Sequence, residues 1–134
     1  MSNREWVPVS KVMRRDVTHV DGRIDVFEAL RIMKRVQATC LIVDKQHDND
    51  EYGMLLFSDI AKQVIARDRA PERVNVYEIM AKPVIFVRPD MDIRYCARLF
   101  ENFGISHAPV IEDNEIVGVV SYYLLVLEGL PDLD

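Results

Sequence analysis

The chain has 134 residues, of which 49% are apolar and 29% are charged, and 22 acidic against 17 basic residues give a net charge of −5. This composition suits one compact soluble domain or two very small ones, and the acidic balance argues against a general nucleic-acid surface. The longest uncharged apolar stretch, residues 116–127, is too short to cross a bilayer, and the N-terminus lacks the apolar core of a signal peptide. We therefore expect a cytoplasmic protein that binds neither membranes nor nucleic acids.

Residues 12–66 predict a short extended segment, a helix, two strands and a second helix, in that order. The predicted ranges are residues 17–20, 26–36, 40–43, 52–57 and 58–66. The first helix has the clearest signal, because Asp25 is a typical N-cap residue and Glu28, three residues later, completes a capping box. Apolar side chains then recur at helical spacing and predict one buried face.

The same order of elements returns about 67 residues later. Six positions are identical after this shift, about three times what chance gives at ~6% per position; they are Met13/Met80, Val17/Val84, Val20/Val87, Asp25/Asp92, Arg31/Arg98 and Val43/Val110. Each copy is too small to bury much apolar surface alone. We therefore expect two copies that pack together as one pseudo-symmetric domain of the α/β (α+β) class.

The end of the second copy is its most regular part. Residues 104–121 predict two strands around a polar turn, and Ser121 is a typical N-cap residue for a following helix. Gly118 leaves a position without a side chain in the second of these strands. A ligand or another stretch of backbone can approach closely at such a position.

Few residues have the spacing that metal binding or catalysis requires. The three histidines are scattered, and Cys40 and Cys96 lie in apolar patterns without a Cys-x-x-Cys spacing, so we interpret the cysteines as buried thiols and expect no structural zinc site. There is no glycine-rich phosphate loop and no nucleophile elbow. We therefore predict that the chain is not an enzyme.

The duplicated pattern resembles the CBS domain, and two copies in tandem resemble a stand-alone Bateman module. The residues that carry the resemblance are Val12-Met13 and Ile79-Met80, the helix starts at Asp25 and Asp92, and segments 53–60, 107–110 and 118–121. On this basis, residues 8–67 form the first CBS repeat and residues 75–130 the second. The resemblance implies two small sheets, each with two helices, which pack through their sheets and leave two clefts.

In the CBS family such clefts often hold an adenosine-containing ligand, such as AMP, ADP, ATP or S-adenosylmethionine, although none is obligatory. The family's ribose mark is Gly-x-x-Thr/Ser-x-x-Asp, in which the carboxylate accepts hydrogen bonds from the ribose diol. Asp59 matches the acid of the first copy, but Leu56 stands at the hydroxyl position. Ser121 matches the hydroxyl of the second copy, but Leu124 stands at the acid position. Helix capping is the alternative role for both Asp59 and Ser121.

The resemblance also nominates an adenine wall and a phosphate contact. The wall residues are Thr18, Val20, Thr39 and Cys40 in the first copy, and Ile85, Val87, Ile105, Ser106 and Pro109 in the second. Ordinary core packing is the alternative for each of them. His107 occupies the position that points toward phosphates in the family, where a polyphosphate raises the charged fraction of a histidine. Arg14, Arg15 and Lys82 either add positive charge there or are simply solvated.

The resemblance therefore implies a regulatory sensor that binds an adenosine ligand and signals to a partner by a conformational change. The alternatives are a ligand-free association module with vestigial pockets and a regulatory subunit of a separate enzyme or transporter. We also expect a homodimer, because the predicted second helix of each copy carries more apolar residues than one small core covers. These residues are Ile60, Val64, Leu124, Leu125 and Leu127.

Overall fold

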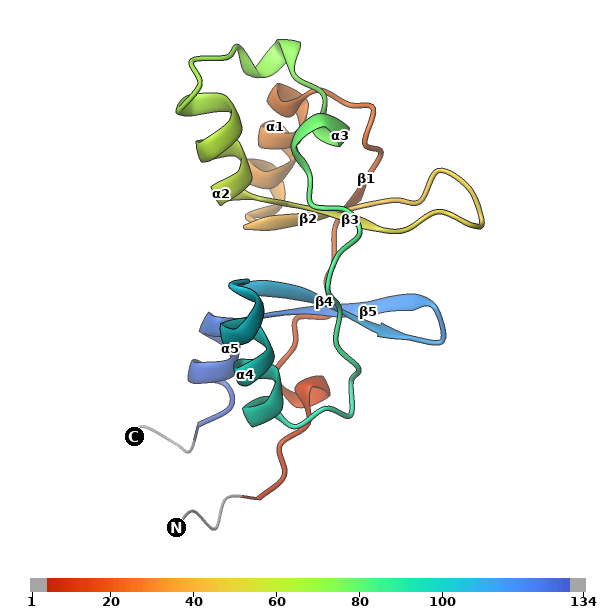
Figure 1. Cartoon of the computed structure of the whole chain (residues 1–134), viewed down its shortest axis with the longest axis vertical. Coiled ribbons are helices and arrows are strands. Elements are labelled where there is room, and N and C mark those ends of the chain that lie inside the picture. The colour runs from red at the N-terminus through yellow and green to blue at the C-terminus, as the bar shows by residue number, and fades with distance from the viewer. Residues whose placement is uncertain (1–4, 131–134) are drawn as a thin grey trace. The chain divides into compact units, whose positions relative to one another are not determined.

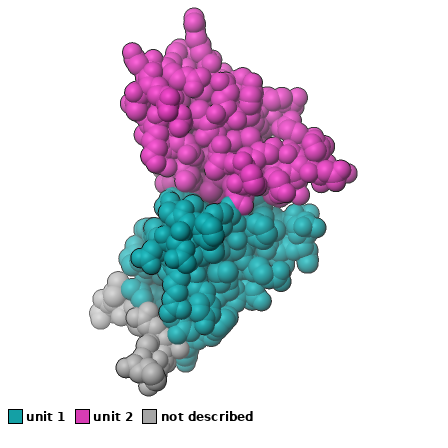
Figure 2. Space-filling view, viewed as in Figure 1, with its two compact units in different colours: residues 1–17, 85–134 teal, residues 18–84 magenta. Residues whose placement is uncertain are grey.

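A computed structural model describes residues 5–130, which form two compact units (Figures 1 and 2). Unit 2 is Thr18–Val84, and the described residues of unit 1 are 5–17 and 85–130. Both units combine helices with a small sheet, which confirms the α+β class expected from the sequence. Within residues 5–130, no helix is long and apolar enough to cross a membrane.

Unit 2 is built around a three-stranded sheet with two helices on one face (Figure 1). The first strand pairs in parallel with the second, and the second pairs antiparallel with the third. Leu41, Val43 and Leu55 point from the sheet into the core beneath the helices. The elements are β1 (His19–Val20), α1 (Val26–Val36), β2 (Cys40–Val43), β3 (Gly53–Leu56), α2 (Phe57–Ile60), its π-helical continuation η2 (Ala61–Ile65), η3 (Pro71–Arg73) and α3 (Val76–Ile79).

Unit 1 repeats this arrangement with a two-stranded hairpin. Its elements are η1 (Val9–Lys11), α4 (Ile93–Phe103), β4 (His107–Glu112), β5 (Glu115–Ser121) and α5 (Tyr122–Leu127). Val87 adds a parallel bridge to Val110, at the position where β1 pairs with β2 in the other unit. Both helices lie on one face of the hairpin (Figure 1), and Phe100 is completely buried in the core between them.

In each unit, a segment that lies next to the other sequence repeat along the chain completes the fold through backbone hydrogen bonds. The closing hydrogen bonds are Val9 N to Met91 O (2.8 Å) and Ile93 N to Val7 O (2.9 Å) in unit 1, and Val76 N to Ile24 O (2.9 Å) and Val26 N to Val74 O (2.8 Å) in unit 2. Residues 8–17 therefore lie in the unit that contains the second sequence repeat, and residues 71–84 in the unit that contains the first. The bounds of the compact units therefore differ from the bounds of the sequence repeats.

The predicted helix caps and strands agree well with the structure. Asp25 accepts a hydrogen bond from the Glu28 amide at 2.8 Å, and Asp92 accepts one from the Arg94 amide at 2.8 Å. The strand at residues 40–43 is confirmed. The helix expected to open at Ser58 instead begins one residue earlier, so that Ser58 lies inside its first turn.

The prediction of which apolar side chains are exposed was partly wrong. Ile60, Val64 and Leu125 are 2–5% exposed, because they lie on the helix faces that cover the sheets. Of the predicted set, Leu127 is the one that is half exposed. The other large apolar side chains exposed on these helices are Phe57, Ile65, Tyr122, Tyr123 and Val126.

Candidate functional site

The polar candidates of unit 1 meet at one end of the β4–β5 hairpin. His107 pairs directly with Ser121 across the two strands. The Ser106 hydroxyl lies 2.8 Å from His107 Nδ1, and the Ser106 carbonyl accepts a hydrogen bond from the Tyr122 amide at 3.2 Å. Ser106, His107 and Ser121 therefore lie next to one another where the hairpin meets α5.

Burial lowers the pKa of His107 from its usual value, because desolvation disfavours the imidazolium. The side chain is therefore predominantly neutral at pH 7. In that state one ring nitrogen donates and the other accepts. A bound anion would have to supply the free energy that protonates this ring, so phosphate binding at His107 would be coupled to proton uptake.

Ser121 has the capping role that the sequence left open. Its hydroxyl oxygen accepts a hydrogen bond from the Leu124 amide at 3.3 Å and so caps α5. The side chain is buried. A hydroxyl that accepts from one amide still has its own hydrogen to donate, so capping leaves Ser121 one hydrogen bond for a second partner.

Asp59 also binds the backbone of its own helix. Its Oδ2 accepts a hydrogen bond from the Leu56 amide at 2.9 Å, which satisfies a free N–H at the start of α2. The side chain is half-buried. A carboxylate has lone pairs for several donors, so Oδ1 remains able to accept from a ribose hydroxyl.

Most of the expected wall residues contribute to the cores. Val20 and Val87 are buried in the core clusters of unit 2 and unit 1, and Ile105 packs against the second of these clusters. Pro109 is buried and Ile85 is half-buried. The core-packing role is thus observed for Val20, Val87 and Ile105.

The wall residues of unit 2 that remain partly exposed are polar or sulfur-containing. Thr39 is exposed, and Thr18 and Cys40 are half-buried. The Thr18 carbonyl accepts a hydrogen bond from the Ile42 amide at 2.9 Å, so its backbone continues the pairing of β1 with β2. Cys40 stands opposite Leu56 across β2 and β3, in the same register that His107 and Ser121 have in unit 1.

The three candidate cations already have partners. Arg14 forms an ion pair with Asp16 at 3.0 Å, and Lys82 forms one with Asp50 at 2.8 Å. The Arg15 guanidinium donates to a backbone carbonyl of its own segment. A phosphate would have to compete with these bonds, which favours the solvated or structural role over the anion-binding one.

The cysteines differ in their surroundings. Cys96 is completely buried, and desolvation raises the pKa of its thiol to about 11. Cys40 is half-buried, so the expectation of two buried thiols holds for Cys96 alone. Among residues 5–130, no three His, Cys, Asp or Glu side chains come together in the manner of a metal site.

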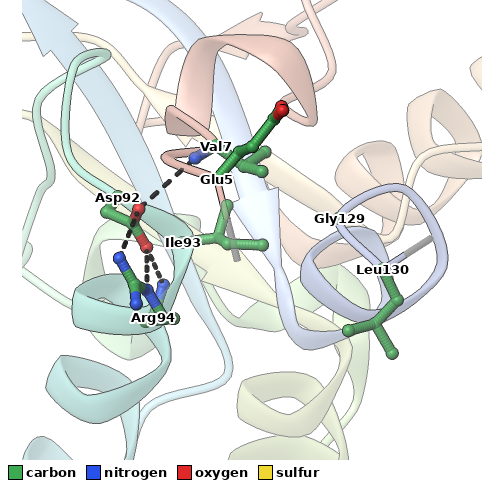
Figure 3. A pocket seen from close by; sticks show the side chains of 7 residues that line it. All are labelled: Glu5, Val7, Asp92, Ile93, Arg94, Gly129 and Leu130. Atoms are coloured by element: carbon green, nitrogen blue, oxygen red, sulfur yellow. Dashed lines mark hydrogen bonds and ion pairs between the residues drawn. The ribbon is translucent and has the colours of Figure 1, made fainter. Parts of the chain in front are cut away.

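A cavity of about 280 Å³ lies in unit 1, and none of the candidate residues lines it (Figure 3). Its walls are Glu5, Val7, Asp92, Ile93, Arg94, Gly129 and Leu130. The buried Asp92 carboxylate accepts hydrogen bonds from the Val7 amide (3.3 Å) and from Arg94 Nε (3.0 Å). Sequence reasoning missed this cavity, because its residues are brought together only when the N-terminal segment joins unit 1.

Comparison with known families accounts for the duplicated architecture. The model of the CBS domain matches the chain twice, at residues 9–66 and 76–126. The chain belongs to the CBS domain family. The two matches follow each other as a tandem CBS pair, which confirms the resemblance seen in the sequence.

Known relatives show how widely the CBS pair is used. The chain is 34% identical to a hexameric CBS-CP12 protein from bloom-forming cyanobacteria, with a TM-score of 0.89 over 91% of this chain and 70% of that one. It is also 34% identical to a homoserine O-acetyltransferase of Methanosalsum zhilinae, over 85% of this chain and 22% of that enzyme. The curated relatives it matches first are longer, and the chain spans between about a fifth and three-fifths of their length.

One solved CBS pair of the same fold contains ligands. The CBS pair of protein MJ0100, in complex with 5-methylthioadenosine and S-adenosyl-L-methionine, has a TM-score of 0.76 and 23% identity over 89% of this chain and 96% of that one. This likeness shows that the two proteins share a fold.

Proposed function

We propose that this CBS pair is a regulatory module that binds an adenosine-containing ligand, such as AMP, ADP or ATP, and signals to a partner enzyme or transporter by a conformational change. The observation that carries the proposal is the cluster of Ser106, His107 and Ser121 at one end of the β4–β5 hairpin. Ser106 and His107 are partly exposed, and the Ser121 hydroxyl has a hydrogen left to donate, so the cluster can form hydrogen bonds with a polar ligand. The adenosine ligands of MJ0100 support the choice of ligand class.

In this proposal each polar residue has a separate task. In unit 2, Asp59 accepts from the ribose diol of a bound nucleoside through Oδ1 while Oδ2 keeps its bond to the Leu56 amide. In unit 1, His107 takes up a proton and pairs with a phosphate group, and Ser121 donates its hydroxyl hydrogen. The ligand changes the conformation only to the extent that it binds one arrangement more tightly than the other.

The test is a thermal-shift panel with AMP, ADP, ATP, S-adenosylmethionine and NAD. A ligand at 100 times its dissociation constant stabilises the folded state by ~2.7 kcal/mol, which raises the Tm by several degrees. Asp59→Asn keeps an oxygen that accepts from the Leu56 amide but loses the charge, so it should abolish the shift without unfolding α2. Leu124→Ala, at the corresponding position of the other repeat, is the matched control and should leave the ligand shift in place.

The proposal fails if no member of the panel moves the Tm and no adenine absorbance accompanies the purified protein. It also fails in its assignment of the ribose contact if Asp59→Asn and Leu124→Ala reduce the ligand shift equally.

A second candidate function, association of two copies, is favoured by the exposed apolar face of α5. Tyr123 is 62% exposed, and Val126 and Leu127 are each 50% exposed. Apolar side chains gathered in this way on one helix are typical of an interface. We propose a homodimer through this face, and Val126→Glu should convert it to a monomer in sedimentation velocity. A wild-type chain that stays monomeric across the micromolar range would contradict this.

A further inference from the structure

The longest loop of unit 2 contacts the two segments through which the chain enters and leaves this unit. Unit 2 begins at Thr18 and ends at Val84. His19 lies just after the first crossing and Lys82 just before the second. Residues 44–52, the loop between β2 and β3 (yellow in Figure 1), contact both of these side chains.

The contact at the second crossing is a partly buried ion pair. Lys82 Nζ lies 2.8 Å from Asp50 Oδ1 and 2.9 Å from Oδ2, and the side chains are 28% and 14% exposed. Asp50 Oδ2 also accepts from the Gln46 amide at 2.8 Å. These bonds, with that of Lys82 the strongest, hold the pKa of Asp50 well below its usual range. Asp50 therefore forms one bond within the loop, to Gln46, and one to Lys82 in the segment that leaves unit 2.

The contacts at the first crossing involve Asp44 and Tyr52, the two end residues of the loop. His19 Nδ1 lies 2.7 Å from Asp44 Oδ1. The His19 and Tyr52 rings also pack edge to face with their centres 6.3 Å apart, and Lys45 Nζ lies 4.9 Å from the centre of the Tyr52 ring. Both ends of the loop therefore hold the segment that enters the unit.

Unit 1 shows that the fold itself does not need this loop. Its hairpin is closed by a two-residue turn, Asp113 and Asn114, with φ angles of 52° and 65°. The residue that corresponds to Lys82 is Arg15, which donates to the Ser10 carbonyl of its own segment. Among residues 5–130, the longer loop and its two anchors are therefore found in unit 2 and not in unit 1.

We propose that residues 44–52 are a clasp that holds both crossing segments of unit 2, so that opening of the loop frees the two segments together. The segment at the first crossing consists of Thr18 and β1, so it includes two candidate ligand contacts, Thr18 and Val20. The clasp therefore couples local opening of this segment to local opening of residues 81–84. The inference does not depend on which ligand, if any, the module binds.

Hydrogen exchange measured by NMR on the full chain tests the clasp, because backbone bonds report on each crossing. The Asp44 amide donates to the Val20 carbonyl at 2.9 Å, and the Ala81 amide donates to the Met54 carbonyl at 2.9 Å. Asp50→Asn removes the charge next to the second crossing. We expect the exchange of both amides to speed up about fivefold, since a lost ion pair shifts a local opening by roughly this much.

The matched control is Asp48→Asn, which removes the same charge from an exposed position of the same loop. It should leave both amides unchanged, whereas Lys82→Met should reproduce the pattern of Asp50→Asn. Acceleration of Ala81 alone would show two independent anchors and overturn the clasp. Unchanged exchange at both amides, or equal effects of Asp48→Asn and Asp50→Asn, would overturn it as well.

Discussion

Met13 and Gly118 lie in direct contact in unit 1, so closely that a β-carbon on Gly118 would fall 2.7 Å from Met13 Sδ. The same carbon would fall 2.7 Å from the Arg14 carbonyl oxygen. Gly53 and Met80 repeat the relationship in unit 2, where the corresponding distance to the methionine sulfur is 2.7 Å. The close approach expected at Gly118 is therefore made by the segment that closes the unit, through its side chain and its backbone.

Gly118→Ala should destabilise the protein by about 1–3 kcal/mol, the usual cost of overpacking. Gly53→Ala should cost less, because the nearest backbone oxygen there is 3.3 Å away and the methionine end can move. Urea unfolding of the two variants measures the difference. Gly104→Ala is the control for backbone strain alone, since its φ is +64° and no atom lies within 4 Å of the added carbon. A Gly118→Ala cost no larger than that of Gly104→Ala would contradict the packing account.

Asp92→Asn should cost about 1–3 kcal/mol at pH 7, because it removes the charge of a buried carboxylate that accepts from the partly exposed Arg94 and weakens a helix cap. The hydrogen bond from Arg94 is the main reason that the pKa of Asp92 is lowered. A lowered pKa gives stability that is present above the usual carboxyl pKa and is lost as the pH falls through the lowered folded value. The cost measured by urea unfolding should therefore shrink as the pH is lowered from 7 toward 2.

Asp25→Asn is the control for the cap alone, since the half-buried Asp25 caps α1 through the Glu28 amide. It should cost less at pH 7 than Asp92→Asn. Equal costs at pH 7, or a cost of Asp92→Asn that does not change with pH, would show that the Arg94 bond adds nothing.

Cys96 should react with a thiol reagent only when the protein unfolds. The reactive form is the thiolate, and a completely buried thiol with a pKa of about 11 is almost fully protonated at pH 8. In a Cys40→Ser variant, the reaction rate of the remaining thiol should rise sharply through the urea transition. Rapid labelling of the native variant would show that the site opens locally.

His107→Asn should weaken the binding of ATP and leave the binding of adenosine nearly unchanged, if His107 contacts the phosphates. Because burial lowers the pKa of the free histidine, pairing with phosphate must raise it, and the complex takes up a proton. The affinity for ATP should then increase as the pH falls from 8 to 6. Isothermal titration in buffers of different ionisation enthalpy measures both the affinity and the proton uptake, and an affinity independent of pH would exclude this role.

The sequence predicted local features of the fold but made no prediction of the compact units. The caps at Asp25 and Asp92 and the strand at residues 40–43 follow from local spacing, and the structure confirms them. The sequence placed residues 8–17 in the first repeat but did not show that they pack in the unit of the second repeat, because an apolar pattern shows that a segment is buried and not which core receives it. The short helix α3 (Val76–Ile79) was missed for a similar reason, since four residues give no helical period to recognise.

The candidate site shows the same limit. The sequence nominated Asp59 and Ser121 but left capping and ligand binding open, and the structure shows that both cap helices. The neighbourhood of His107 and Ser121 depends on strand register, and the structure shows a register shift between Val110 and Ile111 that the turn and the apolar pattern did not indicate. The loop contacts of Asp50 and Lys82 join residues far apart in the chain, so no local pattern indicated them.

The closing segment of unit 1 has a consequence for biosynthesis. Unit 2 is one continuous stretch, so all of its parts have left the ribosome soon after Val84 has been made. Val9 and Val12, by contrast, belong to a core whose other members include Phe100 and Leu125, so these two side chains are synthesised about 90 to 115 residues before their partners are complete. We therefore expect unit 2 to fold first during synthesis, and Val9 and Val12 to become buried only after Phe100 and Leu125 have been made.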